Sequence, residues 1–392
     1  MNDWSHTRIL NNLRRCTRCT EPETHETIVF DNEGVCNICR AHEFKKEKVD
    51  WEDRKKELRR LAEEYRGKGR AYDCIVPFSG GKDSTFTLWY IVKELGLRPL
   101  VVSFDHGFYR PRTLENNERT QRRLGVDFLK FRSDWKVVKK LMLESLKRKG
   151  DFDWHAHVGS FAYPMQIAVK FKIPLLFWGE SSAEYTAYYR FDEIEEVDER
   201  RHHRLNDLGI AAEDMVGFLR GEVDMRDLES YIYPAFKELR AINVRSVCLG
   251  SFILWDTQKN YEIIRNELGW RGDQVEGLPP DKWPFEKVEY QLQGPRDYLK
   301  FIKRGYARVT HRTTIDIRNG RMTRAEGKKL IEQYEGRRPQ SLDYLLKILG
   351  IDEAEWRRVA VSQAIPPYVH DFSKEKNDEP LWDMKLWDWN PG

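Results

Sequence analysis

Short apolar runs alternate with amphipathic stretches through the middle of the chain. The runs YDCIVPF (72–78), RPLVVSF (98–104) and VDFLKF (126–131) have the length and composition of buried strands. Between them lie DSTFTLWYIVKELG (83–96) and LENNERTQRRLG (114–125), two helical patterns that each end at a glycine. This βαβαβ order predicts parallel strands joined by right-handed crossovers.

Two further pairs of a helix and a strand extend the same pattern. SFAYPMQIAVKFK (160–172) precedes IPLLFWG (173–179), and FKELRAIN (236–243) precedes VRSVCLG (244–250). We therefore predict an α/β fold whose core, residues 72–250, is a doubly wound parallel sheet of five strands.

The remaining segments flank or interrupt this sheet. Leu58, Leu61 and Tyr65 have the spacing of an amphipathic helix, and the tail LWDMKLWDWNPG (381–392) is expected to fold back onto the body. The predicted organisation is a small cysteine-bearing unit (1–48), a linker helix (49–71), the sheet domain (72–250) with a helix-bearing insertion (181–235), and a mostly helical C-terminal domain (251–392).

Composition narrows the class of protein. Among 392 residues, 67 basic side chains nearly balance 64 acidic ones, which gives a net charge of +3 and argues against a nucleic-acid binder. No apolar run reaches the length of a membrane span, and the segment MNDWSHTRILNNLRRC lacks the apolar stretch of a signal peptide. We expect a cytoplasmic protein.

The hexapeptide Ser79-Gly80-Gly81-Lys82-Asp83-Ser84 lies between the first predicted strand and the helix that follows it. The glycines allow a sharp turn close to a phosphate, and the helix N-terminus offers unpaired N–H groups to the anion. The two hydroxyls and the ammonium group of Lys82 add donors, while Asp83 suits either Mg²⁺ on the phosphates or the start of the helix. The loop predicts a phosphate site, although its spacing is not that of a Walker loop.

Two CxxC pairs, Cys16 with Cys19 and Cys36 with Cys39, are separated by sixteen residues. This spacing is typical of a closed structural zinc site with four thiolates. An iron–sulfur cluster or a redox pair is the alternative. Cys74 and Cys248 stand alone within apolar strand patterns.

The loop SGGKDS after a first strand resembles the PP-loop of the ATP pyrophosphatase superfamily. The resemblance implies cleavage of ATP to AMP and pyrophosphate with Mg²⁺, and an adenylate that ammonia or sulfur then displaces. It assigns the nucleotide to the loop and to the end of the second strand, and catalysis to Lys82 and Asp83. Glu180 ends the fourth predicted strand, where ligands of open α/β sheets bind, and it suits a catalytic role through Mg²⁺ or the substrate, or else a structural role. The residues implied to bind the nucleotide are Ser79, Gly80, Gly81, Lys82, Asp83, Ser84, Ser103, Phe104 and Asp105, followed by His106.

Several further segments narrow the resemblance. The cysteine quartet, SGGKDS, LGSFILWDTQKN (249–260), ELGW (267–270) and the block FIKRGYARVTHRTTIDIRNGRMTRAEG (301–327) together are similar to the N-acetyl sugar amidotransferase family of surface-polysaccharide biosynthesis, which acts in O-antigen assembly. The resemblance implies that an acetamido group on a nucleotide-activated sugar becomes an acetamidino group through an adenylated intermediate attacked by ammonia.

The chain itself shows no glutaminase unit, since position 2 is asparagine and neither lone cysteine has the context of a nucleophile. The resemblance implies a separate partner similar to the glutaminase of histidine biosynthesis, with a cyclase-like companion.

Other candidate residues also have structural alternatives. His311, Arg312, Asp316, Arg318 and Arg321 alternate as in a strand, before a turn at Asn319-Gly320, and suit either a sugar carboxylate or diphosphate or a solvated face. Trp255 with Asp256 suits sugar stacking or core packing, and His155 with His157 suits capping or packing near a helix start.

Two other functions remain open from the sequence. A tRNA thiolation enzyme of the same superfamily combines a cysteine zinc unit with SGGKDS, but usually has further catalytic cysteines. A nucleotide-binding scaffold without catalysis is disfavoured because Lys82, Asp83 and both loop serines are present.

Overall fold

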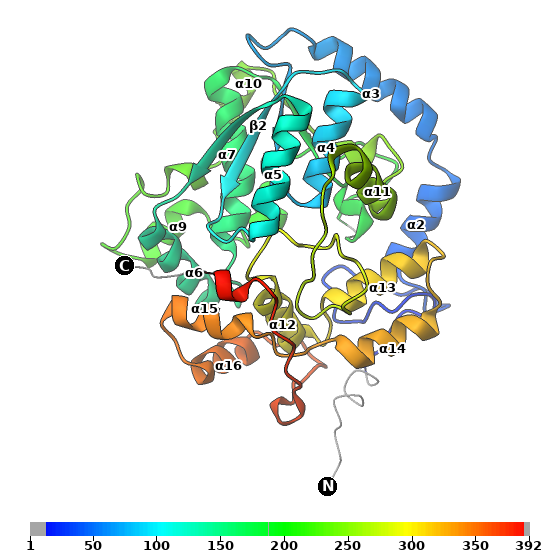
Figure 1. Cartoon of the computed structure of the whole chain (residues 1–392), viewed down its shortest axis with the longest axis vertical. Coiled ribbons are helices and arrows are strands. Elements are labelled where there is room, and N and C mark those ends of the chain that lie inside the picture. The colour runs from blue at the N-terminus through cyan, green and yellow to red at the C-terminus, as the bar shows by residue number, and fades with distance from the viewer. Residues whose placement is uncertain (1–12, 187, 388–392) are drawn as a thin grey trace.

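Five parallel strands form one sheet in the part of the chain that the computed structural model describes, residues 13–186 and 188–387 (Figure 1). The sheet order is β3-β2-β1-β4-β5, so the chain builds outward on one side of β1 and then on the other. This confirms the doubly wound sheet predicted from the sequence. The strands are β1 (Cys74–Pro77), β2 (Pro99–Asp105), β3 (Asp127–Arg132), β4 (Leu175–Trp178) and β5 (Arg245–Cys248).

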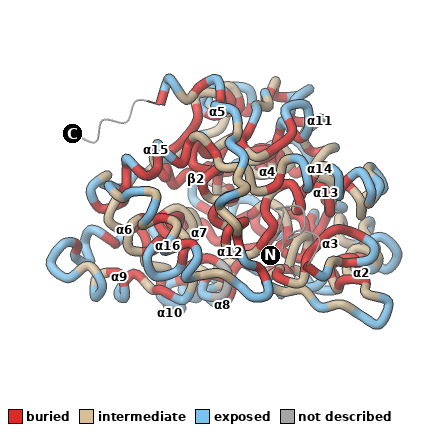
Figure 2. The backbone as a smooth tube through the Cα atoms, turned by 90° about the horizontal axis from the view of Figure 1, so that it is seen from below, coloured by how far each residue is buried: buried red, intermediate tan, exposed pale blue. Residues whose placement is uncertain are grey.

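Alternate strand residues pack against helices on opposite faces of the sheet. Val76, Val101 and Phe177 share one core with α4 (Lys82–Lys93) and α11 (Thr257–Leu268). Their neighbours Ile75, Leu100 and Leu176 share another core with α7 (Trp154–Phe171) and α10 (Phe236–Ala241). Because both faces are covered, β1, β2 and β4 are largely apolar and buried, whereas the edge strand β3 is partly exposed and carries Asp127, Lys130 and Arg132. The buried backbone gathers at the centre of the molecule around β2 and α4 (Figure 2).

The helices outside the sheet cores cover its edges and build the N- and C-terminal regions. None of the described helices is both long and apolar enough to cross a membrane. The remaining helices are α2 (Asn37–Glu47), α3 (Trp51–Tyr65), α5 (Pro111–Leu124), α6 (Trp135–Lys149), α8 (Glu199–Arg201), α9 (Ala212–Phe218), α12 (Gln293–Arg304), α13 (Arg308–Arg318), α14 (Arg324–Tyr334), α15 (Ser341–Leu349) and α16 (Glu353–Ser362).

The strand predicted for the charged block after residue 307 is wrong, because residues 308–318 form the helix α13. Its β-branched residues favour a strand locally, but the helix buries Val309, Arg312 and Asp316 on one side, and tertiary packing decides. The hydroxyl of Thr313 donates to the carbonyl of Thr310 within the helix. The predicted turn is confirmed, with Gly320 in the left-handed conformation at φ +70°.

Helix α6 was not predicted from the sequence pattern, whereas the insertion 181–235 was expected to carry helices. Helix α6 follows β3, with Asp134 as its N-cap and Gly150 as its left-handed end. The insertion 181–235 holds only short helices, joined by turns, and contacts the body through the edge of β5. Helix α11 lies beyond residue 250 but packs against α4, so the domain boundary at that residue stays a prediction.

The described part of the tryptophan-rich tail, residues 381–387, packs onto the body. Arg110 and Asp383 are both fully buried and form a two-pronged ion pair, with Nε–Oδ2 and Nη2–Oδ1 distances of 2.9 Å. Asp273 completes the pairing of Arg110 at 3.2 Å. The last five residues of the tail lie outside the described residues.

Replacing Asp383 with asparagine should destabilise the protein strongly, because the Arg110 charge would remain buried without its main partner. Loss of one member of a buried ion pair costs about 3–5 kcal/mol. Urea unfolding followed by tryptophan fluorescence would measure the loss, with Glu118→Gln as the control, since Glu118 pairs with Arg122 on the exposed face of α5. Equal midpoints for Asp383→Asn and the wild type would contradict the assignment.

Candidate active site and metal centre

The SGGKDS loop joins the carboxyl end of β1 to the N-terminus of α4. Gly80 has φ +82°, and a Cβ there would collide with the Asn117 side chain, so this turn requires glycine. The Ser79 N–H donates to Ser84 Oγ at 3.3 Å, and the Ser84 hydroxyl donates to the carbonyl oxygen of Gly81 at 3.2 Å. No side chain caps the start of α4, which leaves its N–H groups for an anion.

A cavity of about 310 Å³, called the loop cavity below, opens beyond the carboxyl ends of β1, β2 and β4. The sheet order reverses between β1 and β4, and ligands of open α/β sheets bind at such a point. The loop cavity is lined by Pro77, Phe78, Ser79, Gly81, Asp83, Ser84, Val102, Phe104, His106, Tyr109, Ser160, Phe161, Trp178, Gly179, Glu180, Tyr185, Arg201, Lys287 and Glu289.

A second cavity of about 210 Å³, called the arginine cavity below, lies on the other side of the loop. It shares Asp83, Glu180, Tyr185 and Lys287 with the loop cavity, so the two spaces meet at these side chains. Its other lining residues are Lys82, Glu184, Trp255, Asp256, Thr257, Glu286, Arg308, His311, Arg312, Ile315 and Asn319.

The three residues implied to be catalytic lie together at this junction. Lys82 is 6% exposed and its Nζ lies 2.7 Å from Asp83 and 3.1 Å from Glu286. Burial opposes the charge on Lys82, but these two carboxylates outweigh it and hold its pKa above the ordinary value. Burial and the neighbouring Glu180 raise the pKa of Asp83 to about 6, although Lys82 offsets part of the effect.

The sequence analysis missed Glu286, as well as Tyr185 and Lys287, which line both cavities. Glu286 receives ion pairs from Lys82, from Arg308 at 3.1 Å and from Arg312 at 3.4 Å. Burial alone would raise its pKa, but the three cations hold that pKa well below the ordinary value. Glu286 lies in an irregular segment between α11 and α12, where no periodic pattern or motif could have identified it.

The residues at the end of β2 differ in their placement. Phe104 and His106 line the loop cavity, whereas Ser103 and Asp105 do not. Ser103 Oγ lies 3.3 Å from the hydroxyl of Tyr109. Asp105 pairs with Lys130 at 2.7 Å and Arg132 at 2.5 Å, and these contacts outweigh burial and lower its pKa.

The C-terminal candidates divide into two groups. His311 and Arg312 line the arginine cavity, as does Trp255, which also packs edge-on against Phe86 in the core. Asp316 and Arg321 pair with each other at 3.0 Å and so belong to the framework.

The other candidates also have framework contacts. Asp256 caps α11 and pairs with Arg321 at 3.1 Å. His155 and His157 both lie in the first turn of α7. Burial lowers the pKa of His155 to about 4.

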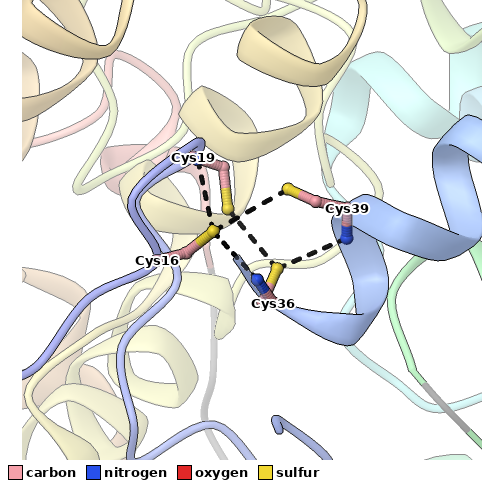
Figure 3. A group of neighbouring side chains, drawn as sticks. All are labelled: Cys16, Cys19, Cys36 and Cys39. Carbon is pink, nitrogen blue, oxygen red and sulfur yellow. Dashed lines mark hydrogen bonds between the residues drawn. The ribbon is translucent and has the colours of Figure 1, made fainter. Parts of the chain in front are cut away.

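The four N-terminal cysteines converge on one point (Figure 3). Cys16 and Cys19 come from a loop, and Cys36 and Cys39 from the start of α2. The Sγ atoms of Cys16 and Cys39 are 4.0 Å apart, and those of Cys19 and Cys36 are 3.8 Å apart. Ligands about 2.3 Å from a tetrahedral ion lie about 3.8 Å from one another, so the four thiols fit one such ion.

Two arginines connect this cluster to the C-terminal helices. Arg318 of α13 lies 3.9 Å from Cys19 Sγ and pairs with Glu21 at 3.6 Å. Arg324 of α14 donates to the backbone carbonyls of Cys16 and Cys19. Because α13 also carries His311 and Arg312, the cysteine unit supports one wall of the arginine cavity.

The sheet order, the glycine loop at its switch point and the cavity beyond it define an open α/β fold with a candidate phosphate site, the arrangement that the resemblance to the PP-loop superfamily implied. Residues 284–386 match the family of WbpG-like LPS biosynthesis proteins over its C-terminal domain. This match covers about a quarter of the chain, so the C-terminal region is similar to the C-terminal domain of that family, in line with the resemblance to a surface-polysaccharide family.

Two curated proteins are similar to about a third of the chain. An uncharacterised protein of Methanocaldococcus jannaschii is 27% identical over 122 residues, which are 31% of this chain and 43% of that protein. The glutamine-hydrolysing GMP synthase of Pyrobaculum aerophilum is 32% identical over 124 residues, 31% of this chain and 23% of the synthase. The matched region thus spans less than half the length of either relative.

Two solved structures also align with the chain. The NMN synthetase of Francisella tularensis aligns over 60% of this chain and all of its own, at 11% identity and a TM-score of 0.29. The U34-tRNA thiolase NcsA of Methanococcus maripaludis, solved with its 4Fe–4S cluster, aligns over 92% of this chain and all of its own, at 12% identity and a TM-score of 0.30.

The purified protein should contain about one tetrahedrally bound metal ion per chain. Replacing Cys36 with serine should lower the metal content and the thermal midpoint, because one of four ligands is lost. Elemental analysis and thermal unfolding would measure both, with Cys74→Ser as the control, since Cys74 lies buried in β1 away from the cluster. A metal content unaffected by Cys36→Ser would contradict the site.

Proposed function

We propose that this protein is an ATP-dependent, AMP-forming amidotransferase that converts an acetamido group of a nucleotide-linked N-acetyl sugar into an acetamidino group, for O-antigen and other surface-polysaccharide biosynthesis in the cytoplasm. The observation that carries the proposal is the meeting of two cavities at Asp83, Glu180 and Tyr185. One cavity suits a nucleotide and the other an anionic acceptor. The WbpG-like match of residues 284–386 supports the sugar class.

ATP occupies the loop cavity in this proposal. The backbone of Gly80 and Gly81, the start of α4 and the hydroxyls of Ser79 and Ser84 bind its phosphates, and the adenosine lies toward Phe104 at the end of β2. Asp83 and Glu180 would suit Mg²⁺, because burial and the repulsion between these two neighbouring carboxylates raise the pKa of Asp83, and a bound cation would relieve both effects. When bound, Mg²⁺ supplies positive charge to the pyrophosphate leaving group.

The sugar nucleotide occupies the arginine cavity. Arg308 and Arg312 provide two guanidinium groups for a diphosphate or a carboxylate, and the aromatic face of Trp255 suits a sugar ring. His311 has a pKa well below its ordinary value because of burial and the nearby Arg308, so its imidazole is neutral. This arrangement brings the acetamido oxygen toward the junction at Asp83.

The reaction needs activation because an amide carbonyl is a weak electrophile. The acetamido oxygen attacks the α-phosphorus of ATP, and pyrophosphate leaves to give an O-adenylyl imidate. Ammonia then adds to the imidate carbon, the added nitrogen loses a proton to solvent, and the C–O bond breaks to release AMP and the amidine. Lys82 and the loop N–H groups stabilise the charge that develops on the phosphates.

Ammonia comes from a separate glutaminase in this proposal, similar to that of histidine biosynthesis and accompanied by a cyclase-like protein. The cysteine cluster holds a structural Zn²⁺, since four thiolates leave no open position for a substrate. Tyr185 borders both cavities, and burial raises the pKa of its hydroxyl, so it remains a neutral donor beside the reacting groups.

Sulfur transfer to tRNA is the less favoured alternative. Cys74 and Cys248 are fully buried in β1 and β5, burial raises the pKa of both thiols, and neither lines the loop cavity or the arginine cavity. Neither has the accessible, activated thiolate that this chemistry requires.

Pyrophosphate release from ATP should depend on both ammonium and a nucleotide-linked N-acetyl sugar, and the product should be lighter by about one mass unit, since NH replaces O. The Lys82→Ala variant should release pyrophosphate on the order of 10²–10³ times more slowly, because a charge-stabilising donor is lost. Lys93→Ala, at the exposed end of the same helix, is the control.

Enzymatic assay of pyrophosphate and mass spectrometry of the sugar give the two readouts. Release that requires tRNA and a sulfur donor instead of a sugar would overturn the proposal, as would release that is indifferent to ammonium.

The activity should also fall as the pH drops through about 6, the pKa of Asp83. Because that pKa is raised, the carboxylate becomes protonated, and loses its attraction for Mg²⁺, at a higher pH than an ordinary aspartate would. A profile of kcat/KM for ATP against pH measures this group in the free enzyme. Asp83→Asn should lower kcat/KM at every pH and remove this acidic limb, whereas a limb near pH 4 in the wild type would contradict the assignment.

A further inference from the structure

Three neighbouring cavities are linked by shared lining residues, and one of them is the arginine cavity of the candidate active site. The arginine cavity shares Arg308 with a small chamber of about 20 Å³. That chamber shares Glu335, Gly336 and Arg337 with an outer cavity of about 210 Å³. The outer cavity has a charged rim of Glu332, Lys374 and Lys376.

The size of the chamber limits what can pass. A volume of roughly 10–15 Å³ is the least that holds one water molecule, so the chamber admits about one molecule of that size. A sugar, a nucleotide or glutamine is far too large. Water and ammonia are small enough.

The chamber walls are rich in hydrogen-bond acceptors. Glu276, Asp297 and Glu335 contribute three carboxylates. Glu276 accepts the Ser341 N–H at 3.0 Å, and Glu335 accepts the Thr310 N–H at 2.8 Å, which fixes the position of both groups. Burial raises the pKa of Glu276 to about 7, so this wall can exchange a proton near neutral pH.

Arg308 separates the chamber from the arginine cavity. Its guanidinium pairs with Asp297 on the chamber side at 3.1 Å and with Glu286 on the active-site side at 3.1 Å. An anionic acceptor in the arginine cavity would compete with Asp297 for this guanidinium and draw it away from the chamber.

We propose that these linked cavities are the route by which ammonia reaches the reacting carbon, and that Arg308 keeps the route closed until the acceptor binds. The inference rests on the amidotransferase function proposed above. In this route, ammonia and the sugar nucleotide enter the active site by separate paths. The protein that supplies ammonia would then dock around the outer cavity, at the end of α14.

Ala307 offers a direct test because it lines the chamber and is 5% exposed. Ala307→Val and Ala307→Leu add methyl groups to a space for one small molecule. The KM for ammonium chloride should rise in that order, by about tenfold or more in Ala307→Leu, while kcat and the KM for ATP and for the sugar nucleotide change by less than about twofold. Ala354→Leu, an identical change on the exposed face of α16, should leave all four constants unchanged.

A widened chamber should have the opposite effect. Ala307→Gly should raise kcat/KM for methylamine relative to ammonium, since the larger nucleophile would then pass. If circular dichroism shows that Ala307→Leu does not fold, Ala307→Val and Ala307→Gly carry the test.

An unchanged KM for ammonium in the folded, bulkier variant, with no gain for methylamine in Ala307→Gly, would overturn the route. Absence of any ammonium-dependent pyrophosphate release by the wild type would instead overturn the proposed function, so the two failures are distinguishable.

Discussion

The candidate site depends on a buried network of charged side chains centred on Glu286. This carboxylate lies between the ammonium of Lys82 and the guanidinium groups of Arg308 and Arg312, and all four side chains are largely removed from water. Separately, each charge would be costly to bury, so the group is stable only when it is complete. The N-terminal half supplies the lysine and the C-terminal half supplies the rest. Neither half can therefore form the candidate site alone, and the C-terminal region that matches the WbpG-like family contributes Arg308 and Arg312 to it.

Helix α13 connects this charge network to the cysteine cluster. His311 and Arg312 near its start face the arginine cavity, while Arg318 at its end lies against the cysteine cluster. A helix transmits position along its axis because its backbone hydrogen bonds make it stiff. A structural ion bound by the four cysteines would therefore fix the position of the α13 side chains that line the arginine cavity, without taking part in the chemistry.

Much of the fold was readable from the sequence, and the reasons are local. Each strand of the sheet is a short apolar run bounded by turn residues, and the loop SGGKDS carries its phosphate chemistry within six consecutive residues. The cysteine spacing was equally direct. By contrast, α13 was predicted as a strand because its β-branched residues alternate, and only burial against the cysteine unit and α14 makes it a helix.

The residues of the site that sequence could not reveal are those whose role comes from distant contacts. Glu286 has no motif, and it is separated by about two hundred residues of sequence from the lysine that it contacts. Asp105 ends β2 as a ligand residue would, yet the cations of β3, Lys130 and Arg132, hold its carboxylate away from the loop cavity. Ion pairs between neighbouring strands can thus determine where a side chain points, and the sequence of one strand alone does not show them.

The ion pair between Arg110 and Asp383 has a consequence for biosynthesis. The two residues are 273 positions apart, so the arginine leaves the ribosome long before its partner. During that interval the guanidinium of Arg110, at the start of α5, must remain in contact with water, although it is buried in the folded protein. Chains that terminate before residue 383 would retain this defect permanently, which would expose them to chaperones and proteases that recognise incompletely folded products.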